Sequence, residues 1–153
     1  MTEPTSKGID GQRAEALFHA ITAAAANARV GVIVTRAGTA QNEVEVIYLN
    51  RGLEVLLEAP RDEIIEKGVW SYVDPAELTR LYEMHAAPAR GEALPTTFRT
   101  AMVTKTGRRV PIDVALGSVD LDGRSASVAF IIDTTSRADA EEALRRSQAL
   151  LDR

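Results

Sequence analysis

The last third of the chain contains three segments with the composition and alternation of β-strands, joined by two short turns. They run from Thr96 to Lys105, from Arg109 to Val119 and from Ser125 to Asp133. The second turn contains Asp122-Gly123, a dipeptide that strongly favours a two-residue hairpin turn. Residues 128–132 are continuously apolar, which predicts a central strand covered on both faces. Apolar residues also alternate along the middle segment and give it one apolar face, formed by Val110, Ile112, Val114 and Leu116.

The first half predicts an amphipathic helix followed by a β-hairpin. Apolar residues recur at helical spacing from Gln12 to Ala28, and Asp10 is placed to cap this helix. Two segments rich in β-branched residues follow, Val30 to Arg36 and Glu43 to Leu49, with a turn at residues 37–42 between them. This order predicts that the hairpin adds two strands to the three at the end of the chain.

Several short helices are predicted between the hairpin and the last three strands. Leu53, Leu56 and Leu57 share the face of one, and Ile64 and Ile65 lie on a second that ends at Gly68. The third has a clear start signal, with Asp74 at the N-cap and Pro75 at the first helical position, and is closed by Pro88 and Gly91. Its apolar stripe is predicted to be Leu78, Leu81, Tyr82 and His85.

Composition excludes several classes of function. The 153 residues suit one domain, and the chain has no cysteine for disulfides, thiolate metal sites or cysteine nucleophiles. A net charge of −4 and an aromatic content of 5% argue against binding nucleic acid. The apolar runs are too short for a membrane span, and the N-terminus has no signal-peptide pattern, so we expect a cytoplasmic protein without membrane contact.

From Thr135 the pattern becomes helical and has coiled-coil spacing. Ala140, Leu144, Ser147 and Leu151 step by four, three and four residues, which is typical of a coiled-coil seam. The chain stops within this pattern without a C-cap signal. We therefore expect a fragment of a longer protein, cut inside a helix that connects it to another domain.

The element order predicts an α+β fold, a five-stranded antiparallel sheet with short helices on one face. Five segments carry a further likeness: Ile47-Tyr48-Leu49-Asn50, Trp70-Ser71-Tyr72-Val73-Asp74-Pro75, Arg90-Gly91-Glu92, Lys105-Thr106-Gly107-Arg108 and Asp133-Thr134-Thr135-Ser136-Arg137. Their order and spacing resemble a PAS domain of a bacterial sensor protein, with Thr106 in place of the family's aspartate and Thr134 in place of its isoleucine. The chain then divides into a flexible tail (1–11), an N-terminal amphipathic helix (12–28), a PAS core (29–134) and the start of a coiled-coil linker (135–153).

The resemblance implies a sensor that dimerises and signals through its last helix to an output module, often a histidine kinase. Asp133, Thr135 and Arg137 are the expected transmission residues. A salt bridge between Asp133 and Arg137, with a contact from the Thr135 hydroxyl to backbone, would fix the direction of the helix. The alternative is that Asp133 and Arg137 only cap a helix start.

The resemblance also raises the question of a cofactor. In haem-binding relatives an axial histidine projects from the helix that corresponds to the one carrying His85. Flavin photochemistry of the adduct-forming relatives is excluded because it needs a cysteine, while non-covalent FAD remains open. The candidate pocket residues are Trp70, Tyr82, His85, Phe98, Met102 and Phe130, and Tyr72 could join them. Their alternative role is that of ordinary core residues.

No catalytic or metal-binding motif is found, and a proton relay between Asp74 and His85 would span too many helical turns. We therefore expect no enzymatic activity in this fragment. The expected homodimer would use apolar residues of the first and last helices, namely Leu17, Phe18, Ile21, Leu144 and Leu151. The alternative function is a ligand-free module for protein–protein interaction.

Overall fold

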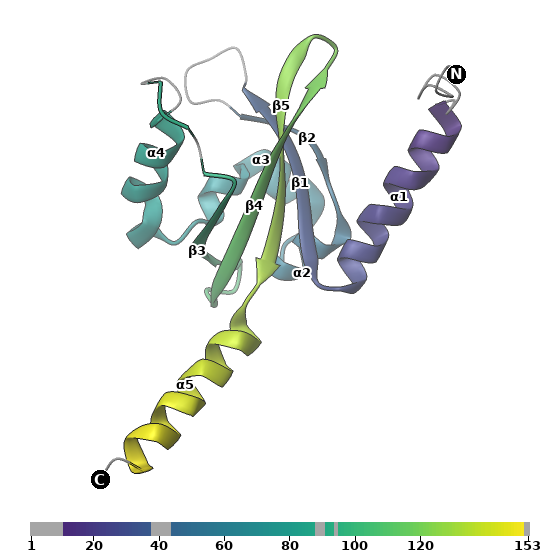
Figure 1. Ribbon diagram of the computed structural model, residues 1–153. Coiled ribbons are helices and arrows are strands. Elements are labelled where there is room, and N and C mark those ends of the chain that lie inside the picture. Colours follow the sequence, from purple (N-terminus) through teal and green to yellow (C-terminus); the bar gives the residue numbers. More distant parts are fainter. Residues whose placement is uncertain (1–10, 38–43, 88–90, 94, 152–153) are drawn as a thin grey trace, which may run out of the picture.

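The computed structural model describes residues 11–37, 44–87, 91–93 and 95–151 (Figure 1). Several predicted features lie outside the described residues. They are the tail before Gly11, the Asp10 cap, the turn after Ala37, and the residues Pro88 and Arg90.

Five strands form one antiparallel sheet, as predicted. In chain order they are β1 (Val30–Ala37), β2 (Val44–Leu49), β3 (Thr97–Val103), β4 (Arg109–Leu121) and β5 (Arg124–Asp133). Their order in the sheet is β2-β1-β5-β4-β3, so the last strand is central and the N-terminal hairpin pairs with it. The predicted hairpin turn is confirmed because Asp122 and Gly123 both have positive φ, 54° and 76°, as a type I′ turn requires.

The short helices cover one face of the sheet. They are α2 (Arg51–Leu57), α3 (Arg61–Lys67) and α4 (Leu78–Ala86), with 3₁₀ turns η2 (Val69–Tyr72) and η3 (Pro75–Glu77) between them. The predicted N-cap at Asp74 is confirmed, since its side chain accepts a hydrogen bond from Ala76 N at 3.1 Å. It caps the 3₁₀ turn η3, however, and the α-helix itself begins at Leu78 instead of Pro75. The core lies between these helices and the inner face of the sheet, where Leu49, Leu53, Leu57, Ile64 and Val110 are at most 1% exposed.

Helix α1 (Gly11–Asn27) packs on the opposite, outer face. The ring of its Phe18 meets the ring of Tyr48 edge-on at 4.7 Å, and Tyr48 lies opposite Val34 in the β1–β2 pairing. Val32 and Val34 on this face are buried, whereas Phe130 and Ile132 of β5 remain 37% and 39% exposed. The prediction that β5 is covered on both faces is therefore wrong for the described residues, because α1 lies over β1 and leaves the rest of the outer face open.

Asn50 joins α1, β1 and α2 through a buried set of hydrogen bonds. Its Oδ1 accepts from Val32 N at 2.8 Å and, as the N-cap of α2, from Leu53 N at 3.1 Å. Its Nδ2 donates to the carbonyl oxygens of Thr22 and Val30, both at 3.1 Å. One side chain thus attaches the N-terminal helix to the sheet and starts the next helix.

Helix α5 (Thr135–Leu151) continues from the central strand and projects away from the body of the protein (Figure 1). None of its residues is buried. Among the described helices, none is long and apolar enough to cross a membrane.

Candidate functional site

Four of the six predicted pocket residues form an aromatic cluster at the edge of the sheet. Trp70 of η2 stacks on Tyr82 of α4, with ring centroids 5.0 Å apart and planes 13° apart. His85, one turn further along α4, meets Trp70 edge-on at 4.8 Å and Phe98 of β3 at 6.3 Å. The structure therefore brings Trp70, Tyr82, His85 and Phe98 together from three separate elements.

The other two predicted pocket residues lie elsewhere. Met102 lies opposite Val110 on the inner face and belongs to the buried core. Phe130 lies opposite Ala115 and Val32 on the outer face. Its assignment to a pocket between the sheet and the short helices is therefore wrong, because side chains of successive residues alternate between the faces and the register places Phe130 outside.

The predicted apolar stripe of α4 should be buried against the sheet, but its aromatic residues are exposed. Leu81 is buried, but Tyr82 is 56% exposed and His85 is also exposed. His85 Nδ1 lies 2.9 Å from the carbonyl oxygen of Leu81, which can only accept, so Nδ1 carries the proton in this contact. The cluster thus forms a surface of α4 and not the lining of an interior cavity.

Beside four buried side chains of the described core, there is no space for a haem or a flavin. Leu53, Leu57, Ile64 and Val110, which lie between the inner sheet face and the helices, have 0% exposure. A side chain with no accessible surface borders no void large enough for water, so no cradle for a planar cofactor adjoins these residues. Among the residues that the structure describes, no group of three or more histidines and carboxylates is placed to hold a metal ion.

A surface pocket of about 420 Å³ lies beside Tyr72, between the end of β3 and the segment that joins α3 to η3. Burial raises the pKa of Tyr72, and its hydroxyl has no hydrogen-bond partner among the residues that the structure describes. The two cations that line this pocket, Lys67 and Lys105, both bind Glu63, at 2.9 and 2.7 Å. Their charges are therefore already engaged within the chain.

The start of α5 differs from the predicted arrangement. Asp133 Oδ1 accepts hydrogen bonds from Thr135 N at 2.8 Å and from the Thr135 hydroxyl at 2.6 Å. Arg137 instead donates to Asp113 Oδ2 of β4 at 3.1 Å and lies 3.9 Å from Glu141 on its own helix. The predicted Asp133–Arg137 salt bridge is therefore wrong, because Arg137 binds Asp113 instead. The predicted contact from the Thr135 hydroxyl to backbone is also wrong, because this hydroxyl donates to the Asp133 carboxylate. Asp133 acts locally on the helix start, and Arg137 attaches the helix to the sheet.

The predicted interface residues lie on exposed surfaces of both terminal helices. Leu17 and Ile21 of α1 are 55% and 58% exposed, and Leu144 and Leu151 of α5 are 59% and 81% exposed. Phe18 is also exposed but contacts Tyr48 of its own chain. The side of α1 that meets the sheet is centred on Thr22, so α1 presents Leu17 and Ile21 to solvent.

No model of a known protein family matches the sequence, and no curated protein matches it. Solved structures do match the fold. A PAS domain from a two-component sensor histidine kinase is 15% identical, with a TM-score of 0.57 over 78% of this chain and 98% of its own. A domain of a sensory box sensor histidine kinase/response regulator from Geobacter sulfurreducens is 14% identical, with a TM-score of 0.60 over 82% and 99%.

An RNA-binding light-oxygen-voltage receptor is 20% identical, with a TM-score of 0.62 over 99% of this chain and 42% of its own. The identities are low, but the likeness in fold is clear, and the five-stranded antiparallel α+β fold predicted from the sequence is confirmed. The chain has the fold of a PAS domain.

Proposed function

We propose that this chain is a sensory or regulatory domain of the cytoplasm, which forms a homodimer and passes a signal through α5 to an output module in the same polypeptide. The observation that carries the proposal is the placement of α5. This helix starts directly after the central strand, projects from the body and buries none of its residues (Figure 1). Structural neighbours that are named as parts of sensor histidine kinases favour a histidine kinase as the output module.

The exposed apolar residues of α5 support pairing with a second copy. Ala140, Leu144, Ser147 and Leu151 follow coiled-coil spacing and therefore share one side of the helix. Leu144 and Leu151 on this side are more than half exposed. Burying about 500 Å² of apolar surface would contribute roughly 12 kcal/mol before the entropy of association is subtracted. Pairing of α5 would join the two protomers through the helices that lead to the output module.

Sedimentation equilibrium with a matched pair of variants tests this proposal. We expect the wild-type chain to approach twice the 16.5 kDa mass of one chain as its concentration rises. Leu144→Glu places a charge in the seam and should shift the equilibrium to the monomer. Ala149→Glu adds the same charge to the same helix, but five residues from Leu144 and about 140° around the axis, and should leave the dimer intact. A wild-type monomer, or equal effects of both variants, would contradict the proposal.

The packed core favours a second candidate, a regulatory module that acts through protein contacts without a ligand. The absence of accessible surface at Leu53, Leu57, Ile64 and Val110 is the observation behind it. Native mass spectrometry of the purified chain distinguishes the two candidates. A native mass that one or two polypeptides account for in full supports the ligand-free module, whereas a retained small molecule that is lost on denaturation supports a ligand sensor.

A further inference from the structure

Two arginines from different elements meet one carboxylate at the base of α5. Asp113 Oδ2 accepts from Arg137 Nη2 at 3.1 Å, and Asp113 Oδ1 lies 3.4 Å from Arg99 Nε. The Asp113 side chain is 29% exposed, and its Oδ1 is buried and accepts no hydrogen bond from the described part of the chain. Asp113 is therefore a shared partner of β3 and α5.

The sheet register places this carboxylate where α5 leaves the body. Asp113 of β4 lies opposite Ile132 of β5, near the end of that strand, and opposite Arg99 of β3 on its other side. A backbone bond reinforces the junction, since Thr134 N donates to Pro111 O at 2.9 Å. The side chain of Arg137 thus returns to the neighbouring strand just after the chain has left the sheet.

Packing alone does not hold α5 in place. The helix has no buried residue, and within the described residues one side-chain ion pair joins it to the sheet, that of Arg137 with Asp113. The pair is partly desolvated at Asp113 and combines charge with a hydrogen bond, which strengthens it relative to a fully exposed pair.

The second arginine extends the junction toward the aromatic cluster. Arg99 follows Phe98 in β3, and its carbonyl oxygen accepts from Arg80 Nη2 of α4 at 2.7 Å. Arg80 also pairs with Glu77 at 2.9 Å. A displacement of α4 or of edge strand β3 would therefore change how the carboxylate is held.

We infer that Asp113 is the positioning residue that sets the direction of α5, through Arg137, and that Arg99 orients its carboxylate. The inference deepens the proposed function, and its regulatory meaning rests on that function. It assigns control of the direction of α5 to a residue of β4. The geometry itself belongs to the single protomer and is measurable without the dimer.

Distances between spin labels report the direction of α5. Because the chain contains no cysteine, Ser118→Cys on β4 and Ala149→Cys on α5 introduce the two labelling sites alone. Both positions are exposed. The measurement is made in the Leu144→Glu background, so that pairing of α5 cannot substitute for the junction.

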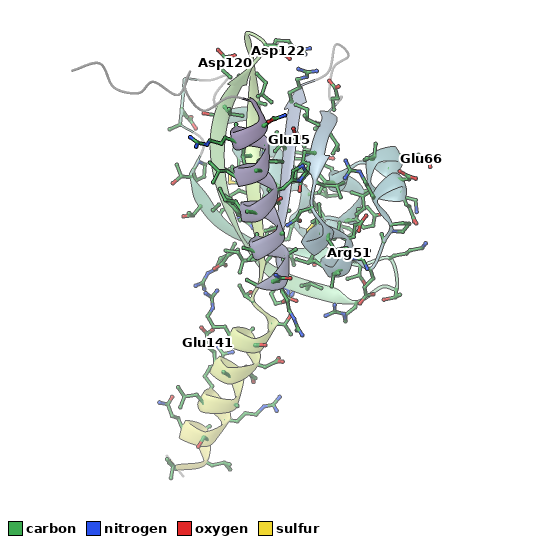
Figure 2. All side chains as sticks on the ribbon, turned by 90° about the vertical axis from the view of Figure 1, so that its right-hand side faces the viewer. Glu15, Arg51, Glu66, Asp120, Asp122 and Glu141 are labelled. Atoms are coloured by element: carbon green, nitrogen blue, oxygen red, sulfur yellow. The ribbon has the colours of Figure 1, made fainter. Side chains whose placement is uncertain are left out.

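We expect a narrow distance distribution in this reference chain and a clearly broader or shifted one in Asp113→Asn. Arg137→Gln should reproduce the effect, and the double variant should add nothing to it. Arg99→Gln should give an intermediate broadening, since the carboxylate loses one of its two partners. Asp120→Asn is the control, an exposed aspartate near the far end of the same strand (Figure 2), and should match the reference.

The inference is overturned if the reference distribution is already broad, or if Asp113→Asn and Arg137→Gln leave it unchanged. A reference-like Arg99→Gln would overturn the role given to Arg99. Circular dichroism melting confirms that each variant is folded, and Arg137 is exposed enough for its replacement to leave the core intact. Failure of dimerisation in sedimentation would refute the proposed function without changing these distances, so the two outcomes are separable.

Discussion

Replacing Asn50 with alanine should destabilise the fold far more than the loss of an ordinary helix cap. Asn50 is 3% exposed, and its side chain makes four hydrogen bonds to the backbone of α1, β1 and α2. Alanine removes all four and leaves buried backbone groups of three elements without these partners.

The magnitude follows from the groups left unpaired. Loss of the N-cap of α2 costs about 1 kcal/mol. The Val32 N–H is buried and loses its partner at 2.8 Å, which costs about 1–3 kcal/mol more. We expect a total near 3 kcal/mol, a large share of the 5–15 kcal/mol that is typical for the unfolding of a domain.

Urea denaturation followed by circular dichroism measures this difference, with Asn27→Ala as the control. Asn27 is exposed at the end of α1, and its replacement should change the free energy of unfolding by less than about 0.5 kcal/mol. Asn50→Asp keeps the size and the Oδ1 acceptor but replaces the Nδ2 donor with an oxygen that faces the carbonyl oxygens of Thr22 and Val30, and should also be destabilising. A cost of 1 kcal/mol or less for Asn50→Ala would refute the view that Asn50 joins three elements.

Three further predictions concern other contacts. Gly52→Ala should lower the midpoint of urea unfolding, because a Cβ at Gly52 would lie 2.3 Å from the carbonyl oxygen of Val30; an unchanged midpoint would contradict this close approach. The pKa of Glu58 is lowered mainly by the hydrogen bond from Thr106. This contact therefore stabilises the β3–β4 turn in full above the pKa of Glu58 in the unfolded chain, about 4.3, and the stabilisation is lost as the pH falls through the lower pKa of the folded state. Amide exchange in the turn, corrected for intrinsic rates, should therefore rise below about pH 4, and Glu58→Gln should abolish this pH dependence. Ile21→Glu should weaken the dimer in sedimentation while leaving the urea midpoint of the monomer unchanged, since Ile21 is 58% exposed; a lower midpoint would place Ile21 in the fold instead.

The sheet was predictable because its signals are local. Alternation along β4, the Asp122-Gly123 turn and the β-branched hairpin each determine structure within a few residues. The N-cap at Asp74 was predictable for the same reason, as capping depends on neighbouring backbone groups.

The orientation of helices and the partners of charged residues were not predictable from local pattern. Helix α1 has small or apolar residues around most of its circumference, so spacing alone did not show that Thr22 would face the sheet. Arg137 pairs with Asp113, 24 positions earlier, and that partner follows only from the β4–β5 register. The outward position of Phe130 also depends on register, because a shift by one residue would reverse its face.

Pairing of α5 between two copies is the central claim, and a single spin label at Ala149→Cys tests it most directly. The label lies away from the proposed seam, so it should not disturb the pairing. For two α5 helices packed in parallel we predict a dipolar distance between protomers of about 20–30 Å, and a longer but defined distance if they are antiparallel. The absence of any dipolar coupling between protomers at concentrations of hundreds of micromolar would contradict the account.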